Sequence, residues 1–367
     1  MLTLAFILLA LMAYIYLGYP LLVWMWASLA PRPIRRGSDQ PPVSVLLPIH
    51  AGAQTVADKL SSLLAQDYPR EQIEIRIYVD GADPETEALI RAVSADEDRI
   101  HLVVGAERKG KPAGLNRLVA DAAGEILVLT DVRQPLEPGA IAALVATLGD
   151  PDVACVSGNR LVSTDVGAGM YWRYEQWIRR NEARARSMIG ATGPLYALRR
   201  QDWLPIPQDI VLDDVYLPMS IRMKTRGRLV LADGARFTDV DMDDQRELER
   251  KVRALAGNYQ LLARLPRLWI PLANPSWFAT ISHRILRLVA PWLLLALGVA
   301  TTALLVEKPL RPEAVVLGVG HVVVYGAATL GRLAGPPGRL ARSFVWMNAA
   351  AIWGLARYAS GRLTVLW

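Results

Sequence analysis

Residues 43–50 read VSVLLPIH, an apolar run that follows Pro41-Pro42 and ends in a polar turn. A short apolar run bounded by turn signals predicts a buried strand over 43–49. Strands are also expected at 73–79, 100–104 and 125–130, and helices at 55–65, 84–93 and 111–122. This alternation indicates an α/β fold with a mostly parallel sheet that helices cover.

Polar residues stand directly after three of these strands. His50 follows the first strand, Asp80-Gly81 follows the second, and Asp131 follows the strand at 125–130. Ligands of parallel sheets bind beyond the carboxyl ends of the strands, so we expect these side chains at one rim. A carboxylate there accepts hydrogen bonds from a base or ribose hydroxyl, or holds a hard cation. An ordinary Asp-Gly turn is the alternative for residues 80 and 81.

A basic, glycine-containing segment lies between these strands. Residues 108–116 read RKGKPAGLN and open a predicted helix. The positive charge and the free amides at the start of a helix suit a diphosphate. The segment lacks the G-x-x-x-x-G-K-[ST] pattern of a P-loop, and a solvated basic loop is the alternative.

Two adjacent carboxylates, Asp213 and Asp214, precede an apolar helical segment at 215–223. Adjacent like charges raise the pKa of one carboxyl group, which suits a general base. The alternative is a helix N-cap, a position where aspartate is preferred.

A cationic stripe is expected farther along the chain. Arg250 and Arg253 lie three residues apart on one predicted helix face, and Arg246 extends the stripe. The stripe would bind pyrophosphate bidentately, or it is a solvated or headgroup-facing surface.

Several other groups favour a structural interpretation. Asp239, Asp241, Asp243 and Asp244 are expected to form a polar loop and helix cap rather than a second metal site. The aromatic cluster of Tyr171, Trp172, Tyr174 and Trp177 has helical spacing and is expected in the core rather than against a sugar. No partner stands at ligand spacing from His283 or His321, so neither is expected to function.

The composition indicates a membrane protein. The 367 residues are 52% hydrophobic with a mean hydropathy of +0.22, which excludes disorder and predicts membrane segments. The single cysteine, Cys155, excludes an internal disulfide framework and a cysteine-only metal cluster, and it suits a reducing cytosol. The mild net charge of +6 fits arginines at lipid headgroups better than a nucleic-acid partner.

Apolar segments stand at both ends of the chain. Residues 1–29 carry no charge and predict an uncleaved anchor rather than a signal peptide, because no basic region precedes them. The basic flank at 31–36 should stay cytoplasmic. Spans are expected at 288–306 and 314–330, with 344–358 as a shorter candidate. A span at 344–358 would place Arg357 and Arg362 outside, against the positive-inside rule, so the C-terminal topology stays open.

In their order along the chain, these motifs resemble the membrane-anchored, processive-type branch of family 2 glycosyltransferases. That branch includes cellulose, chitin, hyaluronan and poly-N-acetylglucosamine synthases. The resemblance covers residues 40–290 and the flanking spans. It is carried by 48–50 (PIH), 79–81 (VDG), 109–116 (KGKPAGLN), 130–133 (TDVR), 190–197 (GATGPLYA), 212–214 (LDD) and 250–254 (RKVRA).

The resemblance implies a GT-A (Rossmann-like) nucleotide-sugar domain at 40–265, after an anchor at 1–30. An interfacial region at 266–284 and a C-terminal transmembrane region at 285–367 would follow. It implies that Asp214 is the catalytic base and Asp131 the metal ligand. The nucleotide sugar would be bound by Pro48, His50, Asp80, Lys111, Asn116 and Arg133. The acceptor and the diphosphate would be bound by Gly193, Pro194, Asp213, Arg250 and Arg253.

The sequence departs from the family pattern at three positions. Arg133 replaces the second D-x-D carboxylate, so the metal would rest on Asp131 and phosphate oxygens, and Arg133 would take part of the diphosphate charge. Ala254 replaces a tryptophan, which weakens the case for polymer translocation. His50 replaces an aromatic residue.

The expected function is inverting transfer of a sugar from a nucleotide donor, UDP-linked by expectation, to a polysaccharide or lipid acceptor. The reaction would need Mg²⁺ or Mn²⁺. It would take place on the cytoplasmic face of the plasma (inner) membrane, with export or regulatory subunits as further partners and no nucleic acid. The alternatives are a non-processive ceramide- or polyprenyl-type lipid glycosyltransferase and a non-catalytic subunit of a polysaccharide synthase. A transporter is disfavoured, because the predicted spans carry no buried charge of the expected kind.

Overall fold

The computed structural model describes residues 1–81, 83–161, 168–238, 244–307 and 309–366. Within them, one sheet has the strand order β3-β2-β1-β4-β6-β5-β7. Its strands are β1 Val43–Ile49, β2 Ile73–Val79, β3 Ile100–Val104, β4 Ile126–Thr130, β5 Val153–Leu161, β6 Leu195–Arg199 and β7 Arg228–Thr238. Strand β6 runs antiparallel to both neighbours, and the other pairs are parallel. The predicted α/β fold with a mostly parallel sheet is confirmed.

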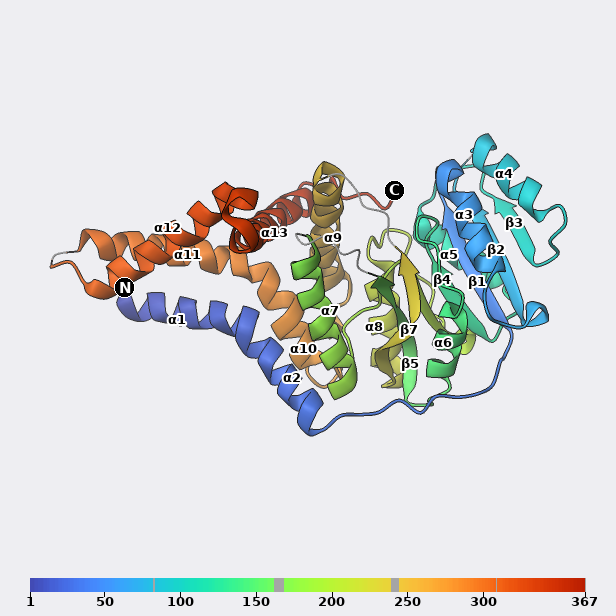
Figure 1. Cartoon of the computed structure of the whole chain (residues 1–367), viewed down its shortest axis with the longest axis horizontal. Coiled ribbons are helices and arrows are strands. Elements are labelled where there is room, and N and C mark those ends of the chain that lie inside the picture. Colours follow the sequence, from blue (N-terminus) through green and yellow to red (C-terminus); the bar gives the residue numbers. More distant parts are fainter. Residues whose placement is uncertain (82, 162–167, 239–243, 308, 367) are drawn as a thin grey trace.

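The sheet lies between layers of helices (Figure 1). Strand β1 is buried along its whole length, as its uninterrupted apolar sequence predicts for a strand covered on both faces. The helices of this domain are α3 Ala53–Leu64, α4 Pro84–Ser94, α5 Lys111–Ala120, α6 Ala140–Leu148, α7 Ala168–Ala185, α8 Asp213–Thr225 and α9 Asp244–Arg264.

The chain order places a topological switch point at the centre of the sheet. From β1 the chain moves outward through β2 to β3, and it then returns to the other side of β1 as β4. Such a reversal is the point at which open α/β sheets bind ligands, beyond the carboxyl ends of the two diverging strands. His50 follows β1 and Asp131 follows β4, so both residues border this point.

Three helices are long and apolar enough to cross a membrane, among the residues that the structure describes. The first, Leu2–Leu29, joins α1 (Leu2–Ala13), a π-helical turn (Tyr14–Gly18) and α2 (Tyr19–Leu29). The second, Trp277–Val306, joins α10 (Trp277–Ala279), a π-helical segment (Thr280–Ile285) and α11 (Leu286–Val306). The third is α12 (Pro312–Leu330). Figure 1 shows α1, α11 and α12 extending away from the sheet domain, and the protein is membrane-associated.

The surface of this helix bundle is apolar. Val316 is 71% exposed and Val322 is 73% exposed, which in water would be an unusual concentration of bare aliphatic surface. Such side chains suit contact with lipid tails.

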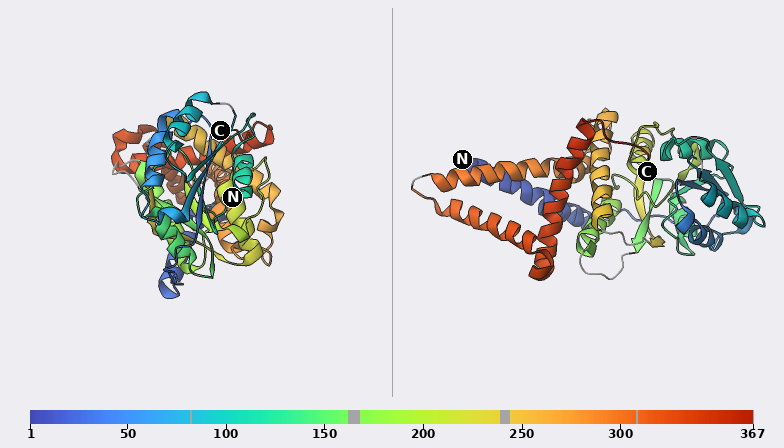
Figure 2. Two further views of the ribbon diagram at one scale, coloured as in Figure 1. Left: turned by 90° about the vertical axis from the view of Figure 1, so that its right-hand side faces the viewer. Right: turned by 90° about the horizontal axis from the view of Figure 1, so that it is seen from above.

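Two boundaries differ from the expectations. Residues 277–284, expected within an interfacial region, form the first turns of the long apolar helix Trp277–Val306. Residues 344–358, the shorter span candidate, lie within α13 (Gly335–Ala359), which is not among the three membrane-crossing candidates. Helix α13 packs against α9 instead, where a Cβ on Gly354 would lie 2.9 Å from the backbone nitrogen of Ala256. Figure 2 shows α13 crossing the direction of α11 and α12.

Candidate active site

Three segments that are far apart in the sequence meet at the carboxyl end of β4. Asp131 directly follows β4, Lys111 begins α5, and Asp213 begins α8. The Lys111 ammonium group lies 2.9 Å from Asp131 Oδ1 and 3.2 Å from Asp213 Oδ2. These carboxylates hold the pKa of Lys111 well above its usual range despite burial, so the lysine carries a firmly held positive charge in this cluster.

Asp214 lies beside this cluster and next to Gly193. A Cβ on Gly193 would lie 3.2 Å from Asp214 Oδ2 and 3.8 Å from Asp131 Oδ2, so both carboxylates face the same small space. Burial raises the pKa of Asp214 to about 6, and the neighbouring charge of Asp213 adds to the effect, while Lys111 opposes it. A carboxylate with this pKa is a competent general base near neutral pH.

Neither aspartate of the pair is the N-cap of α8, so the N-cap alternative is wrong. Leu212 occupies the N-cap of α8, and no side chain caps it. Asp213 and Asp214 lie in the first turn, where the helix dipole stabilises negative charge. The Tyr196 hydroxyl donates to Asp213 Oδ2 over 3.2 Å, which orients that carboxylate toward Lys111.

Asp80 shapes the basic loop that precedes α5. Its side chain is fully buried, and its two oxygens accept hydrogen bonds from the amides of Lys109 (2.8 Å) and Gly110 (2.9 Å). Gly110 has a φ of +86°, a conformation that disfavours residues with a Cβ. A direct contact of Asp80 with a nucleotide base would have to share these two acceptors.

The remaining strand-end residues lie close by. Nδ1 of His50 is 3.0 Å from the carbonyl oxygen of Asp80, and Pro48 is buried at the end of β1. The carbonyl of Pro194 accepts from the Thr130 hydroxyl over 2.8 Å, which ties the glycine segment to β4. Arg133 is exposed on the turn after Asp131.

The sequence motifs do not include Lys59 of α3, which the structure places beside the site. It is completely buried and donates to Thr130 Oγ1 over 2.7 Å and to the carbonyl of Gln134 over 2.6 Å. Burial lowers the pKa of Lys59 to about 7, against the opposing charge of Asp131. The sequence feature that indicates its burial is the helical spacing of Lys59 from Val56 and Leu63, which places it on the apolar face of α3.

Asn116, which the resemblance assigns to the nucleotide sugar, has a different partner in this structure. Its amide donates to the Ile206 carbonyl over 2.7 Å and accepts from the Ile206 amide over 3.0 Å. The side chain therefore clamps α5 to a loop 90 residues away along the chain.

Arg250 and Arg253 do not act as one stripe. Arg250 forms a salt bridge of 2.7 Å with Glu247 and has a side chain that is 42% exposed. Arg253 is half-buried, and it donates to the carbonyl of Val365 over 3.1 Å. Burial lowers the pKa of Arg253, and the charge of Arg357 adds to this shift, while the charges of Asp213 and Asp131 oppose it. Arg253 is therefore the member of the pair that interacts electrostatically with the rim carboxylates.

The C-terminal segment returns to the same rim. A Cβ on Gly110 would lie 3.0 Å from Val365 Cγ2, so the tail after α13 covers the loop that Asp80 shapes. Val365 lies within residues 285–367, for which a C-terminal transmembrane region is expected from the sequence.

The site fits a divalent cation that is bound by one aspartate and mainly by the phosphate oxygens of a bound nucleotide. No group of three His, Cys, Asp or Glu side chains that could hold a metal ion occurs among the described residues. Asp131 is 30% exposed and its Oδ2 faces the space beside Gly193. One aspartate plus phosphate oxygens is a donor set of hard oxygens suited to Mg²⁺ or Mn²⁺. Asp239, Asp241 and Asp243 lie outside the described residues.

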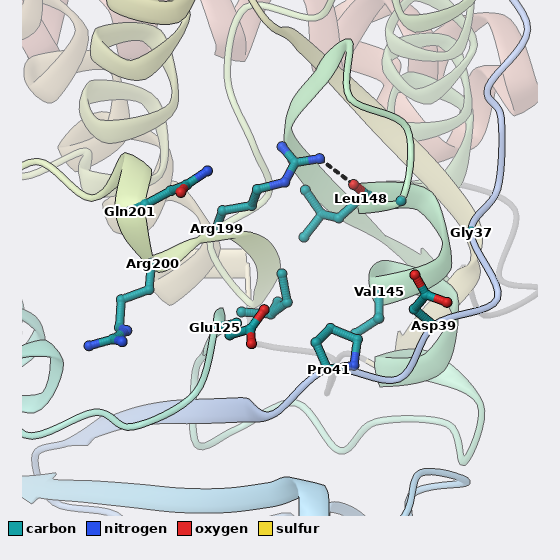
Figure 3. A pocket seen from close by; sticks show the side chains of 11 residues that line it. Gly37, Asp39, Pro41, Glu125, Val145, Leu148, Arg199, Arg200 and Gln201 are labelled. Atoms are coloured by element: carbon teal, nitrogen blue, oxygen red, sulfur yellow. Dashed lines mark hydrogen bonds between the residues drawn. The ribbon is translucent and has the colours of Figure 1, made fainter.

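A separate cavity lies at the opposite end of β4, away from Asp131 (Figure 3). Its volume is about 480 Å³, and its walls include Gly37, Asp39, Glu125 and Arg199. Glu125 precedes β4, whereas Asp131 follows it, so this cavity is roughly one strand length from the carboxylates, or ~16 Å. Arg199 already donates to backbone carbonyls, including that of Val153 over 2.7 Å, and the cavity has no part in the proposed chemistry.

Comparisons with known proteins find related sequences and a related structure. Residues 44–201 match the family described as Glycosyl transferase family 2. The chain is 25% identical over 185 residues to Glycosyltransferase AglE of Haloferax volcanii, which is 47% of this chain and 59% of that protein. It is 27% identical over 119 residues to the Probable glycosyltransferase YdaM of Bacillus subtilis, which is 32% of this chain and 28% of that protein. The chain thus spans little more than half of one relative and less than a third of the other.

A solved structure shares the whole fold. The mannosyltransferase PcManGT from Pyrobaculum calidifontis, in complex with GDP-Man and Mn²⁺, superimposes with a TM-score of 0.77 at 23% identity. The alignment covers 98% of this chain and 99% of that one. The shared architecture therefore includes the membrane-associated helices as well as the sheet domain.

Proposed function

We propose that this chain, whose residues 44–201 match the family 2 glycosyltransferases and whose fold is GT-A-like, transfers a sugar from a nucleotide donor to a membrane-associated acceptor with inversion. The acceptor is a polysaccharide or a lipid. The reaction takes place on the cytoplasmic side of the plasma (inner) membrane, where nucleotide sugars are made. The observation that carries the proposal is the meeting of Lys111, Asp131, Asp213 and Asp214 at one strand end.

The charges at the rim divide into two roles. Lys111, Arg253 and the amides at the start of α5 are the positive groups available to the leaving diphosphate. Asp214 takes the proton of the acceptor hydroxyl, because its raised pKa keeps it basic without making it permanently protonated at neutral pH. Gly193 leaves the space in which the reacting atoms meet, and Asp213 holds Lys111 in place.

A divalent cation, Mg²⁺ or Mn²⁺, would be held by Asp131 and would supply charge neutralisation for the departing diphosphate. The solved neighbour binds Mn²⁺ together with GDP-Man, which supports the cation and adds GDP-sugars to the UDP-sugars as candidate donors. Asp80 and His50 order the loop that borders the nucleotide.

The test is a donor screen with the full chain in native membranes or detergent, supplied with Mn²⁺ and single UDP- or GDP-sugars. Release of the nucleoside diphosphate identifies the donor. Asp214→Asn should abolish turnover while the nucleotide still binds, because the amide cannot accept the proton but leaves the pocket intact. Normal turnover by Asp214→Asn would remove the base from this mechanism. Absence of turnover with every donor would favour the non-catalytic subunit.

A further inference from the structure

A second cavity, with charged side chains in its wall, adjoins the rim on its membrane side. Its volume is about 220 Å³, and it lies between α7, α9 and the start of the helix Trp277–Val306. Figure 1 shows these helices between the sheet and the membrane-crossing bundle. The charged side chains in its wall are Glu175, Arg179, Glu182, His283, Arg284 and Arg287.

One wall of this cavity is continuous with the segment that carries Asp214. Residues 189–191 line the cavity, and the amide of Ala191 donates to the carbonyl oxygen of Asp214 over 2.8 Å. A Cβ on Gly190 would lie 3.3 Å from Arg284 Nη2, so the guanidinium group packs directly against this wall. A molecule held in the cavity therefore lies next to the backbone segment that holds the proposed base.

Part of the charge in the cavity is internally neutralised. His283 lies between two carboxylates, 2.7 Å from Glu182 Oε1 and 3.2 Å from Glu175 Oε2, both of which are too far away along the sequence to be found by spacing. Arg287 forms a salt bridge with Glu175. The Nε atom of Arg287 still has no acceptor among the described residues, although it is buried.

Arg179 and Arg284 form no salt bridge within the part of the chain that the structure describes. Arg179 donates to the carbonyl of Gly190 over 3.3 Å. Arg284 donates to the carbonyl of Ile189 over 3.0 Å and to the side chain of Asn258. Both guanidinium groups are partly buried, and the carboxylates of Glu182, Asp214 and Glu175 are their nearby opposite charges. An anionic ligand would replace the hydration that these groups lose.

We propose that this cavity binds the phosphate of a lipid-linked acceptor and presents the acceptor hydroxyl to Asp214; this rests on the proposed function. Arg179 and Arg284 supply planar donors that match phosphate oxygens in pairs, and Arg287 Nε adds a further donor. The volume is below the ~300–1,000 Å³ of pockets for drug-sized ligands, so it suits a head group rather than a growing polysaccharide.

The position of Arg284 favours the phosphate of a lipid over a free phosphate ion. That residue lies in the helix Trp277–Val306, whose outer surface exposes Trp292 (43%), Leu295 (54%) and Val299 (68%). An acyl or alkyl chain attached to a phosphate in the cavity has this apolar surface directly beyond it. A free phosphate would gain nothing from that surface.

In the transfer step, the acceptor hydroxyl oxygen forms a bond with the anomeric carbon of the donor sugar. The bond between that carbon and the diphosphate oxygen breaks, and its electron pair leaves with the nucleoside diphosphate. Asp214 receives the hydroxyl proton. The lipid phosphate keeps its charge throughout and serves only to hold the acceptor.

The test measures binding of dodecyl phosphate, dodecanol and inorganic phosphate to the full chain in non-ionic detergent. We expect dodecyl phosphate to bind, and Arg179→Gln and Arg284→Gln each to weaken it by about tenfold or more. Arg180→Gln is the matched control, because Arg180 is the next residue of α7 but pairs with Asp233 at the exposed surface. Binding of the nucleoside diphosphate to the same samples reports whether each variant is folded.

Equal binding of dodecyl phosphate by Arg179→Gln, Arg284→Gln and Arg180→Gln would overturn the inference. Equally tight binding of dodecanol would replace it with a neutral-lipid site, and tight binding of inorganic phosphate would remove the lipid from it. Donor turnover in the screen described above is independent of these results. If turnover occurs but dodecyl phosphate does not bind, the acceptor inference fails and the proposed function stands.

Discussion

The carboxyl group of Asp214 shares one buried corner with Asp213, and Lys111 stands opposite the pair. Burial and like charge act in the same direction on Asp214, and the lysine limits the effect, so the resulting pKa lies near 6. The same three residues would give a weak base if they were exposed, because water would screen their interactions. The chemistry therefore depends on burial as much as on residue type.

The pH dependence of turnover should report this environment. We expect kcat/KM for the acceptor to fall about tenfold for each pH unit below about pH 6, because Asp214 is then protonated. Rates of nucleoside diphosphate release between pH 4.5 and 8 measure the effect. Asp121→Asn changes an exposed carboxylate and should leave this fall in kcat/KM below pH 6 unchanged. A fall in kcat/KM that begins only near pH 4 would show that Asp214 titrates as an ordinary aspartate.

Lys59 provides a second test at the scale of one residue. Its pKa is about 7 in the folded chain and about 10.4 in an unfolded one, so between these values the unfolded state binds more protons. Stability should therefore increase as the pH rises from about 7 to 10. Thermal unfolding of Lys59→Met should lack this increase, whereas Lys251→Met, at an exposed lysine, should retain it. A flat profile in the wild type would contradict the low pKa.

At the scale of elements, the segment between α7 and β6 brings backbone close to the carboxylates. Gly190 and Gly193 both lie where a side chain would meet a neighbour, Arg284 in one case and Asp214 in the other. Position 193 has no left-handed φ, so the requirement for glycine there is one of space rather than of backbone conformation. The added methyl group would occupy the volume that Asp214 and Asp131 share.

Gly193→Ala should therefore lower turnover by about tenfold or more while the protein stays folded, since a displaced reacting atom loses much of its rate advantage. Initial rates with saturating donor measure the loss. Gly139→Ala is the matched control, because a Cβ on Gly139 meets nothing within 4 Å. Equal rates for both variants would mean that the reaction uses a different space.

On the scale of the whole molecule, the candidate spans and α13 define which segments share a side of the membrane. The chain leaves the sheet domain along Trp277–Val306, turns near Leu310 and returns along α12. Helix α13 then packs on α9, and Val365 touches the rim. This path puts Arg357 and Arg362 on the same side as the sheet domain, and with the cytoplasmic orientation that we propose for that domain it satisfies the positive-inside rule.

Labelling of introduced cysteines should confirm this path. A membrane-impermeant maleimide should react with Leu310→Cys in right-side-out vesicles and with Ser360→Cys in inside-out vesicles. The native Cys155 gives a low background, because it is buried in the sheet domain. Reaction of both variants in the same type of vesicle would contradict the arrangement.

The sequence alone determined the α/β pattern and the apolar helices, because strand ends and periodicity are set by a few neighbouring residues. The order of its motifs, through the family resemblance, predicted Asp131, Lys111 and Asp214 as site residues. The tertiary structure decided that Lys111 bridges two carboxylates, that Asn116 clamps a loop and that Lys59 is buried beneath the rim. Each of these contacts joins segments dozens of residues apart, where packing of the sheet and its helices, rather than spacing along the chain, sets the distance.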